Sequence, residues 1–183
     1  RAPTKQDMQR LGNLAATGRL DAIDELARTA DRIYDKDHSS NTNRPTVDNL
    51  TLMRAAFDPI GTRVGQGSSA AMAALKYAHG NRRLSSFTPD AFGIAAGMEN
   101  RESLDILLNC KQHQILLSSA VFALQSAADR NIPEAVDFLA DVVDNPRHQA
   151  LWHGVAKGLA GAAARENPRA ADAVRKFSEW EDS

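Results

Sequence analysis

The stretch LQSAADRNIPEAVDFL, residues 124–139, decides the fold because two closely similar stretches occur elsewhere in the chain. They are FGIAAGMENRESLDIL at 92–107 and LAGAAARENPRAADAV at 159–174. If the first residue of each stretch is numbered zero, alanines stand at three and four, a polar turn follows, and an aspartate stands at thirteen. A similarity with a period of 32 to 35 residues is typical of stacked repeats.

Two further copies start at Leu11 and Ile60, with Gly18 and Gly67 in their turns. Each copy reads as two helices, because apolar and small residues recur at helical spacing on both sides of the turn. The sequence predicts helices at 4–17 and 19–35, 46–64 and 68–79, 82–98 and 101–111, 113–130 and 132–144, and 146–165 and 167–180. Pro59 and Pro89 fall inside two of them, where kinks or breaks are expected.

The fold class is therefore all-α, since no useful length of the chain alternates apolar and polar residues as strands do. The copies predict a single domain over 1–183 with about five helix pairs, interrupted by a polar insertion loop at about 36–45. A helix pair cannot bury its apolar face alone, so neighbouring pairs should stack into a continuous core. At the end of the chain, Phe177 and Trp180 are expected to fold back over the fifth pair.

The pattern resembles the HEAT-like class of α-solenoid repeats, and ankyrin repeats are the alternative. The residues that carry the resemblance are the paired alanines, the turn and the short second helix, as in LAGAAARENPRAADAV. The segment NPRHQALWHGVAKGL, which joins two copies, reads as helix where ankyrin repeats have an extended loop. The resemblance implies a right-handed α-α superhelix, a role as scaffold or binding platform, and a groove lined by the second helices.

Composition excludes several classes of function. The 183 residues carry a formal net charge of −1, which favours neither nucleic acid nor a membrane surface as partner. No apolar run reaches transmembrane length. The single cysteine, Cys110, rules out an internal disulfide and does not indicate a compartment. The first residue is Arg1 rather than Met, which is compatible with a piece of a longer chain.

Three short motifs suggest chemistry, and each has a structural interpretation that fits better. Oxygen donors alternate as in the start of a calcium loop at Asp35, Asp37, Ser39 and Asn41. Ser40 and Thr46, however, stand where a glycine and a glutamate are needed. GQGSSA at 65–70 resembles a phosphate loop without the preceding strand, so a helix end and turn are favoured. Cys110 and His113 form C-x-x-H without a third partner. The sequence therefore predicts no catalytic residue, metal site or cofactor.

An aspartate stands at position thirteen in four of the five copies, at Asp24, Asp105, Asp137 and Asp172, while Ala73 takes this place in the copy that starts at Ile60. Position thirteen points away from the buried positions eleven, twelve and fifteen at 100° per residue, so these carboxylates should face solvent. One hypothesis makes them an acidic row that binds a protein or basic peptide. The alternative pairs them with basic side chains such as Arg101 and Arg175.

His148 and Trp152 lie four residues apart, on one face of a helix. Both residues are predicted to contact the partner, with Trp152 as the apolar anchor. A role of Trp152 in the core is the alternative. Two functions follow from the sequence. The first is a non-enzymatic protein–protein interaction module, and the alternative is a small-ligand-binding or enzymatic domain with a pocket in the groove.

Overall fold

The computed structural model describes residues 2–37 and 47–183, and every regular element in these ranges is helical, which confirms the all-α class. The predicted insertion loop and its calcium-type pattern lie outside the described residues, apart from the end of the second helix. The elements are α1 (Lys5–Ala16), α2 (Leu20–Asp37), α3 (Val47–Gly65), α4 (Ser69–His79), α5 (Thr88–Gly97), α6 (Arg101–Leu108), α7 (Leu117–Asp129), α8 (Pro133–Asp144), the 3-10 helix η1 (Pro146–Leu151), α9 (Trp152–Ala164) and α10 (Pro168–Glu181).

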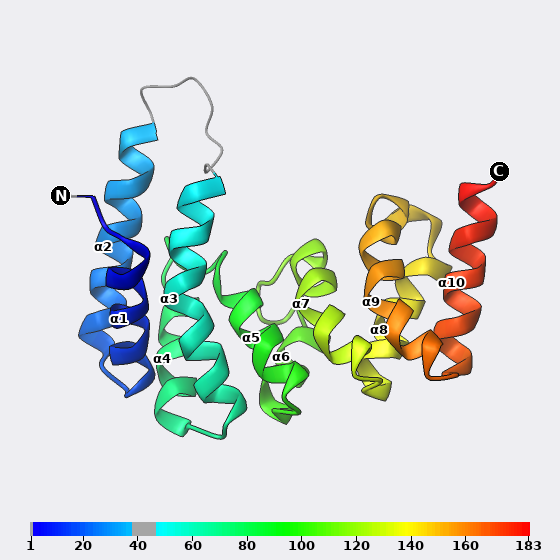
Figure 1. Cartoon of the computed structure of the whole chain (residues 1–183), viewed down its shortest axis with the longest axis horizontal. Helices are drawn as coiled ribbons and strands as arrows, with labels where there is room; N and C mark the ends of the chain where they lie inside the picture. Colours follow the sequence, from blue (N-terminus) through cyan, green and yellow to red (C-terminus); the bar gives the residue numbers. More distant parts are fainter. Residues whose placement is uncertain (1, 38–46) are drawn as a thin grey trace. The chain divides into compact units, whose positions relative to one another are not determined.

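The chain divides into two compact units, Arg1–Ala91 and Phe92–Ser183, so the prediction of a single domain stays a prediction. In the first unit α1 packs on α3 and α2 packs on α4, which stacks one helix pair on the next (Figure 1). In the second unit α7 packs on α9, while α6 and α10 both pack on α8. First helices therefore meet first helices, and second helices meet second helices, within each unit.

The five turns that follow α1, α3, α5, α7 and α9 share a left-handed residue. The residue at position seven has a left-handed φ in every copy: Gly18 at 94°, Gly67 at 91°, Glu99 at 68°, Asn131 at 63° and Glu166 at 62°. The amides at this position and the next donate to carbonyls at four and three in the last four copies, as in Asn131 to Ala128 and Ile132 to Ala127. This pattern is the Schellman end of a helix. The predicted turn at Gly67 is confirmed.

The residue after the left-handed position begins the second helix. Ser68, Asn100 and Asn167 each accept a hydrogen bond from the backbone amide three residues later, which caps α4, α6 and α10. The donating amides belong to Ala71, Ser103 and Ala170, the small residues at position eleven. The repeated sequence thus encodes the end of one helix and the start of the next.

Exchanging Glu166 for glycine is expected to raise the free energy of unfolding by about 0.5–1 kcal/mol. A left-handed conformation costs a residue with a Cβ about 1–2 kcal/mol, and the extra chain entropy of glycine takes back part of that gain. Urea denaturation would measure the change. Glu166→Ala keeps the Cβ and removes the carboxylate, so it should bring no gain. An equal gain from both variants would trace the effect to charge.

The predicted helices are too long in three places. Residues 82–87 form turns, and Pro89 lies in the first turn of α5, where its missing amide hydrogen costs nothing. Residues 109–114 are turns, with Gln114 at φ 58°, so α7 begins at Leu117 instead of 113. Residues 146–151 are 3-10 and His148 has non-helical angles. α3, by contrast, continues across Pro59.

The core at the end of the chain closes as predicted. Phe177 is buried, and its ring lies 5.1 Å from that of His153. The ring of Trp180 lies 5.3 Å from that of Trp152 in an edge-to-face arrangement. The last helix therefore covers α9 with its aromatic residues.

Candidate functional site

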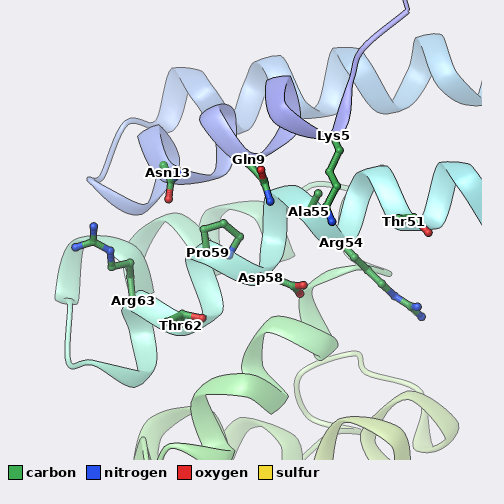
Figure 2. A pocket seen from close by; sticks show the side chains of 10 residues that line it. All are labelled: Lys5, Gln9, Asn13, Thr51, Arg54, Ala55, Asp58, Pro59, Thr62 and Arg63. Carbon is green, nitrogen blue, oxygen red and sulfur yellow. The ribbon is translucent and has the colours of Figure 1, made fainter.

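An open groove runs between α1 and α3 of the first unit and has a volume of about 550 Å³ (Figure 2). Gly12 is buried in α1 against the backbone of Ala56, so the two helices approach closely. Lys5, Gln9 and Asn13 follow each other at intervals of four residues, which places them on one face of α1. The α3 wall is polar as well, with Arg54, Asp58, Thr62 and Arg63 among its residues.

A second hollow of about 470 Å³ shares Gln9, Asn13 and Arg63 with this groove. It adds Leu14, which is 40% exposed and so presents an apolar side chain beside the polar ones. The hollow surface therefore extends to both sides of the amides of Gln9 and Asn13. We refer to the two hollows together as the α1–α3 groove.

Several polar side chains in the groove have no partner among the described residues. This holds for Gln9, Asn13, Thr62 and Arg63, for which the structure shows neither a side-chain hydrogen bond nor an ion pair. An amide side chain offers both a donor and an acceptor, and a guanidinium offers five donors. The groove thus holds hydrogen-bonding capacity that the fold itself does not use.

The ionised form of the Asp58 side chain is destabilised in this groove. Partial loss of hydration raises its pKa above the usual value, and the nearby charge of Asp90 raises it further. Arg54 and Lys5 offset the effect only in part. An acid that the fold disfavours, placed in a hollow, is a feature of functional sites.

Replacing Asp58 by asparagine is therefore expected to stabilise the protein at pH 7, by at most about 1 kcal/mol because the carboxylate is partly exposed. The folded-state pKa is raised, so the ionised form costs stability above it. This cost disappears as pH falls through the folded pKa towards the unfolded one. The gain should thus be present at pH 7 and lost near pH 3.

Asp172 serves as the control, because its pKa is shifted in the opposite direction from that of Asp58. Hydrogen bonds from Arg175 and Lys176 lower its pKa, so its ionised form stabilises the folded chain above the unfolded pKa. Asp172→Asn should lower stability at pH 7, and this loss should also vanish at low pH. Urea denaturation at both pH values measures the two variants side by side. A gain from Asp58→Asn that persisted at pH 3 would contradict the electrostatic explanation.

Three of the four aspartates in the predicted row have a neighbouring partner, and for two of them this partner is an arginine. The Tyr77 hydroxyl donates to Asp24 at 2.8 Å in the first unit. In the second unit Arg101 pairs with Asp105 at 3.0 Å, and Arg175 pairs with Asp172 at 2.7 Å. The alternative of pairing with Arg101 and Arg175 is thus confirmed for these two aspartates. Among the described residues Asp137 alone of the row shows no hydrogen bond or ion pair of its side chain.

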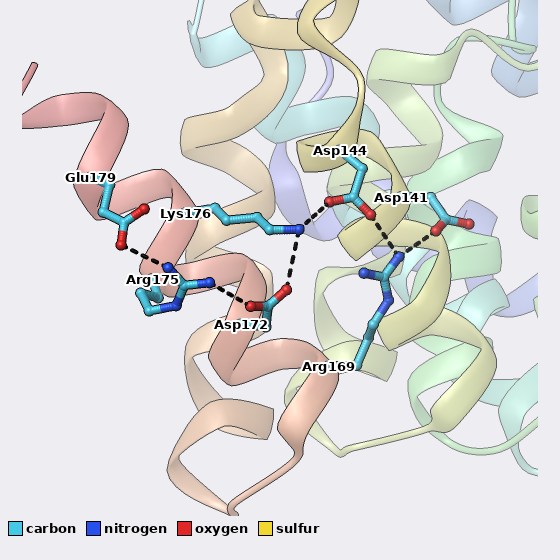
Figure 3. Close-up of polar contacts among 7 residues, drawn as sticks. All are labelled: Asp141, Asp144, Arg169, Asp172, Arg175, Lys176 and Glu179. Atoms are coloured by element: carbon cyan, nitrogen blue, oxygen red, sulfur yellow. Dashed lines mark hydrogen bonds and ion pairs between the residues drawn. The ribbon is translucent and has the colours of Figure 1, made fainter.

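Ion pairs between second helices add to these contacts (Figure 3). Arg169 of α10 contacts Asp141 and Asp144 of α8 at 2.5 and 2.9 Å, and Lys176 contacts Asp144 at 2.8 Å. These contacts lower the pKa of Asp144, chiefly through Lys176. On the surface made by α8 and α10, acidic and basic side chains therefore lie next to each other, so the aspartates there do not form a purely acidic row.

Trp152 lies in the core of the second unit and not on its surface. It is 9% exposed, and its indole N–H donates to the backbone carbonyl of Val142 at 3.0 Å. Burial favours the core role among the two that the sequence left open. The prediction that Trp152 is an exposed anchor for a partner is therefore corrected. His148 is half-buried in η1, outside the helix that was expected to carry it.

The C-x-x-H motif lies outside the helices. Cys110 is buried, His113 is exposed, and both belong to the turns after α6. Among the side chains of residues 2–34 and 48–183, no group of three or more His, Cys, Asp or Glu could hold a metal ion. Within 2–37 and 47–183, no helix combines the length and apolar character that crossing a membrane requires.

Comparison of this chain with family models, with curated proteins and with solved structures finds no match.

Proposed function

We propose that this protein is a non-enzymatic protein-binding module and that the α1–α3 groove receives an extended segment of the partner. The observation that carries the proposal is the set of unpartnered side chains in the groove, above all Gln9 and Asn13. An extended peptide has one N–H and one C=O per residue, and amide side chains can pair with both. Leu14 provides an apolar contact beside them.

The architecture that we propose for the chain is a HEAT-like array of five helix pairs. It is supported by the left-handed residue at position seven of every copy and by the stacking of like helices within each unit. In such an array each pair contacts its neighbours, and the exposed sides of the helices are free to bind other molecules. The groove proposed here uses the first helices, whereas the resemblance implied the second.

The test is selection from a random peptide library displayed on phage, with the full chain as target. We expect enriched peptides whose binding falls at least 10-fold in the double variant Gln9→Ala, Asn13→Ala. The matched control is Gln112→Ala, Gln149→Ala, which removes two exposed amides from the second unit and should leave binding unchanged.

A third variant tests the earlier surface. The triple change of Asp105, Asp137 and Asp172 to Asn should not affect the selected peptides, because two of these carboxylates already have partners. Binding lost in this triple variant and kept in the amide double variant would assign the partner to the aspartate row. A selection that enriches no peptide would overturn the proposed function.

A further inference from the structure

The charged side chains that line the first hollow of the α1–α3 groove are arranged in three zones along the two helices (Figure 2). Lys5 and Arg54 lie towards one end, and Arg63 lies towards the other. Asp58 lies between the basic ends, four residues after Arg54 and five before Arg63. The order along the groove is therefore positive, negative, positive.

The basic ends are available to a ligand. Arg63 forms no ion pair or side-chain hydrogen bond with any described residue. Lys5 forms none either, although its charge acts on Asp58. Arg54 contacts Asp90 at 3.6 Å, but both side chains are about half exposed, at 60% and 45%, so the pair is weak. Each end thus offers at least one cation that can take up a carboxylate.

From this arrangement we infer that the groove recognises an extended acidic peptide in which two carboxylate side chains stand about four residues apart and the residues between them are not acidic. The inference rests on the proposed function and names the chemical class of its partner. Charge complementarity with the two basic ends selects the acidic residues, and Asp58 excludes an acid between them.

The spacing follows from helix and chain geometry. Arg54 and Arg63 are nine residues apart on α3, so their backbone positions are roughly 13 Å apart along the helix axis at 1.5 Å per residue. An extended peptide advances about 3.3–3.6 Å per residue, so roughly four residues cover this distance. Within this length the amides of Gln9 and Asn13 face the peptide backbone.

Asp58 also argues for a peptide over a nucleic acid. A strand of phosphates would place negative charge along the whole groove, including beside Asp58. Domains that bind nucleic acids usually carry a strong positive charge, whereas this chain carries −1. A peptide with two separate acids satisfies both basic ends and avoids the central carboxylate.

The experiment is titration of the ¹⁵N-labelled full chain, followed by NMR, with synthetic heptapeptides of Ser, Ala and Gly. The reference peptide has Glu at positions two and six. We expect it to shift resonances of α1 and α3, and to bind about 10-fold more tightly than the peptide with Gln at both positions, since each exposed ion pair contributes up to about 5-fold. Lys5→Gln and Arg63→Gln should each remove about 2- to 5-fold. Lys157→Gln, an exposed lysine of α9, is the control and should have no effect.

A third peptide tests the role of Asp58. Adding Glu at position four should weaken binding about 2- to 5-fold in the natural chain and have no effect in Asp58→Asn. This double comparison separates the charge of Asp58 from a general loss of fit. An equal loss in both proteins would overturn the assignment of Asp58 as the residue that excludes a central acid.

The outcomes distinguish this inference from the function on which it rests. If neutral and acidic peptides bind alike and the amide variant Gln9→Ala, Asn13→Ala abolishes both, the groove binds proteins and the acidic preference is wrong. If no peptide binds at millimolar concentration while the phage selection yields groove-dependent binders, the inferred acid spacing is wrong. Binding of a single-stranded oligonucleotide that Arg63→Gln abolishes would also overturn the inference.

Discussion

Replacing Gly12 by alanine is expected to lower the free energy of unfolding by about 2–3 kcal/mol, as overpacking of a close helix contact does. A Cβ at this position would lie 2.8 Å from the carbonyl carbon of Ala56 and 3.0 Å from its Cα. These atoms belong to the backbone of α3, so relief requires the two helices to move apart. The higher helix propensity of alanine, about 1 kcal/mol, offsets only part of this cost.

Gly154→Ala is the matched control, because it makes the same chemical change inside another helix. Its nearest neighbours, the side chains of Gln125 and Phe122, lie at 3.5 Å, which is ordinary contact. This variant should be as stable as the natural chain or gain up to about 1 kcal/mol. Urea denaturation measures both. A fully stable Gly12→Ala would show that α1 and α3 lie farther apart, and the groove between them would lose its basis.

Replacing Trp152 by alanine is expected to cost about 3–5 kcal/mol, the usual range for a buried aromatic residue. The change removes the ring that meets Trp180 edge to face and leaves the carbonyl of Val142 without its indole donor. An anchor residue at a partner surface would behave differently, since its loss would weaken binding and leave stability nearly unchanged. Denaturation followed by far-ultraviolet circular dichroism gives the result without relying on tryptophan fluorescence.

Trp152→Phe divides this cost into its two parts. Phenylalanine keeps one aromatic ring and loses the hydrogen bond together with part of the ring volume, so the expected cost falls to about 1–3 kcal/mol. Trp180→Ala should also cost less than Trp152→Ala, because Trp180 is only partly buried. If Trp152→Ala unfolds at the same urea concentration as the natural chain, its place in the core is wrong.

The helices were predictable where local chemistry sets them. Turns that need a left-handed residue and a cap, as at Gly67 and Ser68, leave a clear sequence pattern, and their positions agree with the structure. The errors fall at 82–87, 109–116 and 146–151, where the pattern of apolar residues continues but the α-helix is interrupted. There the chain must pass from one pair to the next, and packing decides the path.

The candidate groove could not be predicted, because it requires knowing that residues about 45 positions apart face each other. Lys5, Gln9 and Asn13 do form a polar stripe at intervals of four, but such a stripe is also typical of any exposed helix face. The ion-pair partners of the aspartates could be predicted from the sequence, since Arg101 and Arg175 lie within about one helical turn of Asp105 and Asp172. The role of Trp152 depends on Trp180, which is distant in sequence.

The shared turn has a consequence for how such a chain can grow. Every helix pair closes at the same register with a left-handed residue at position seven, and most of these turns close through the same pair of amide-to-carbonyl hydrogen bonds. In the array of helix pairs proposed above, a gene duplication of about 32 codons that begins anywhere within a copy would restore a complete turn at the new junction. Length becomes a property that evolution can adjust in whole helix pairs, while residues such as those of the groove diverge independently in each copy.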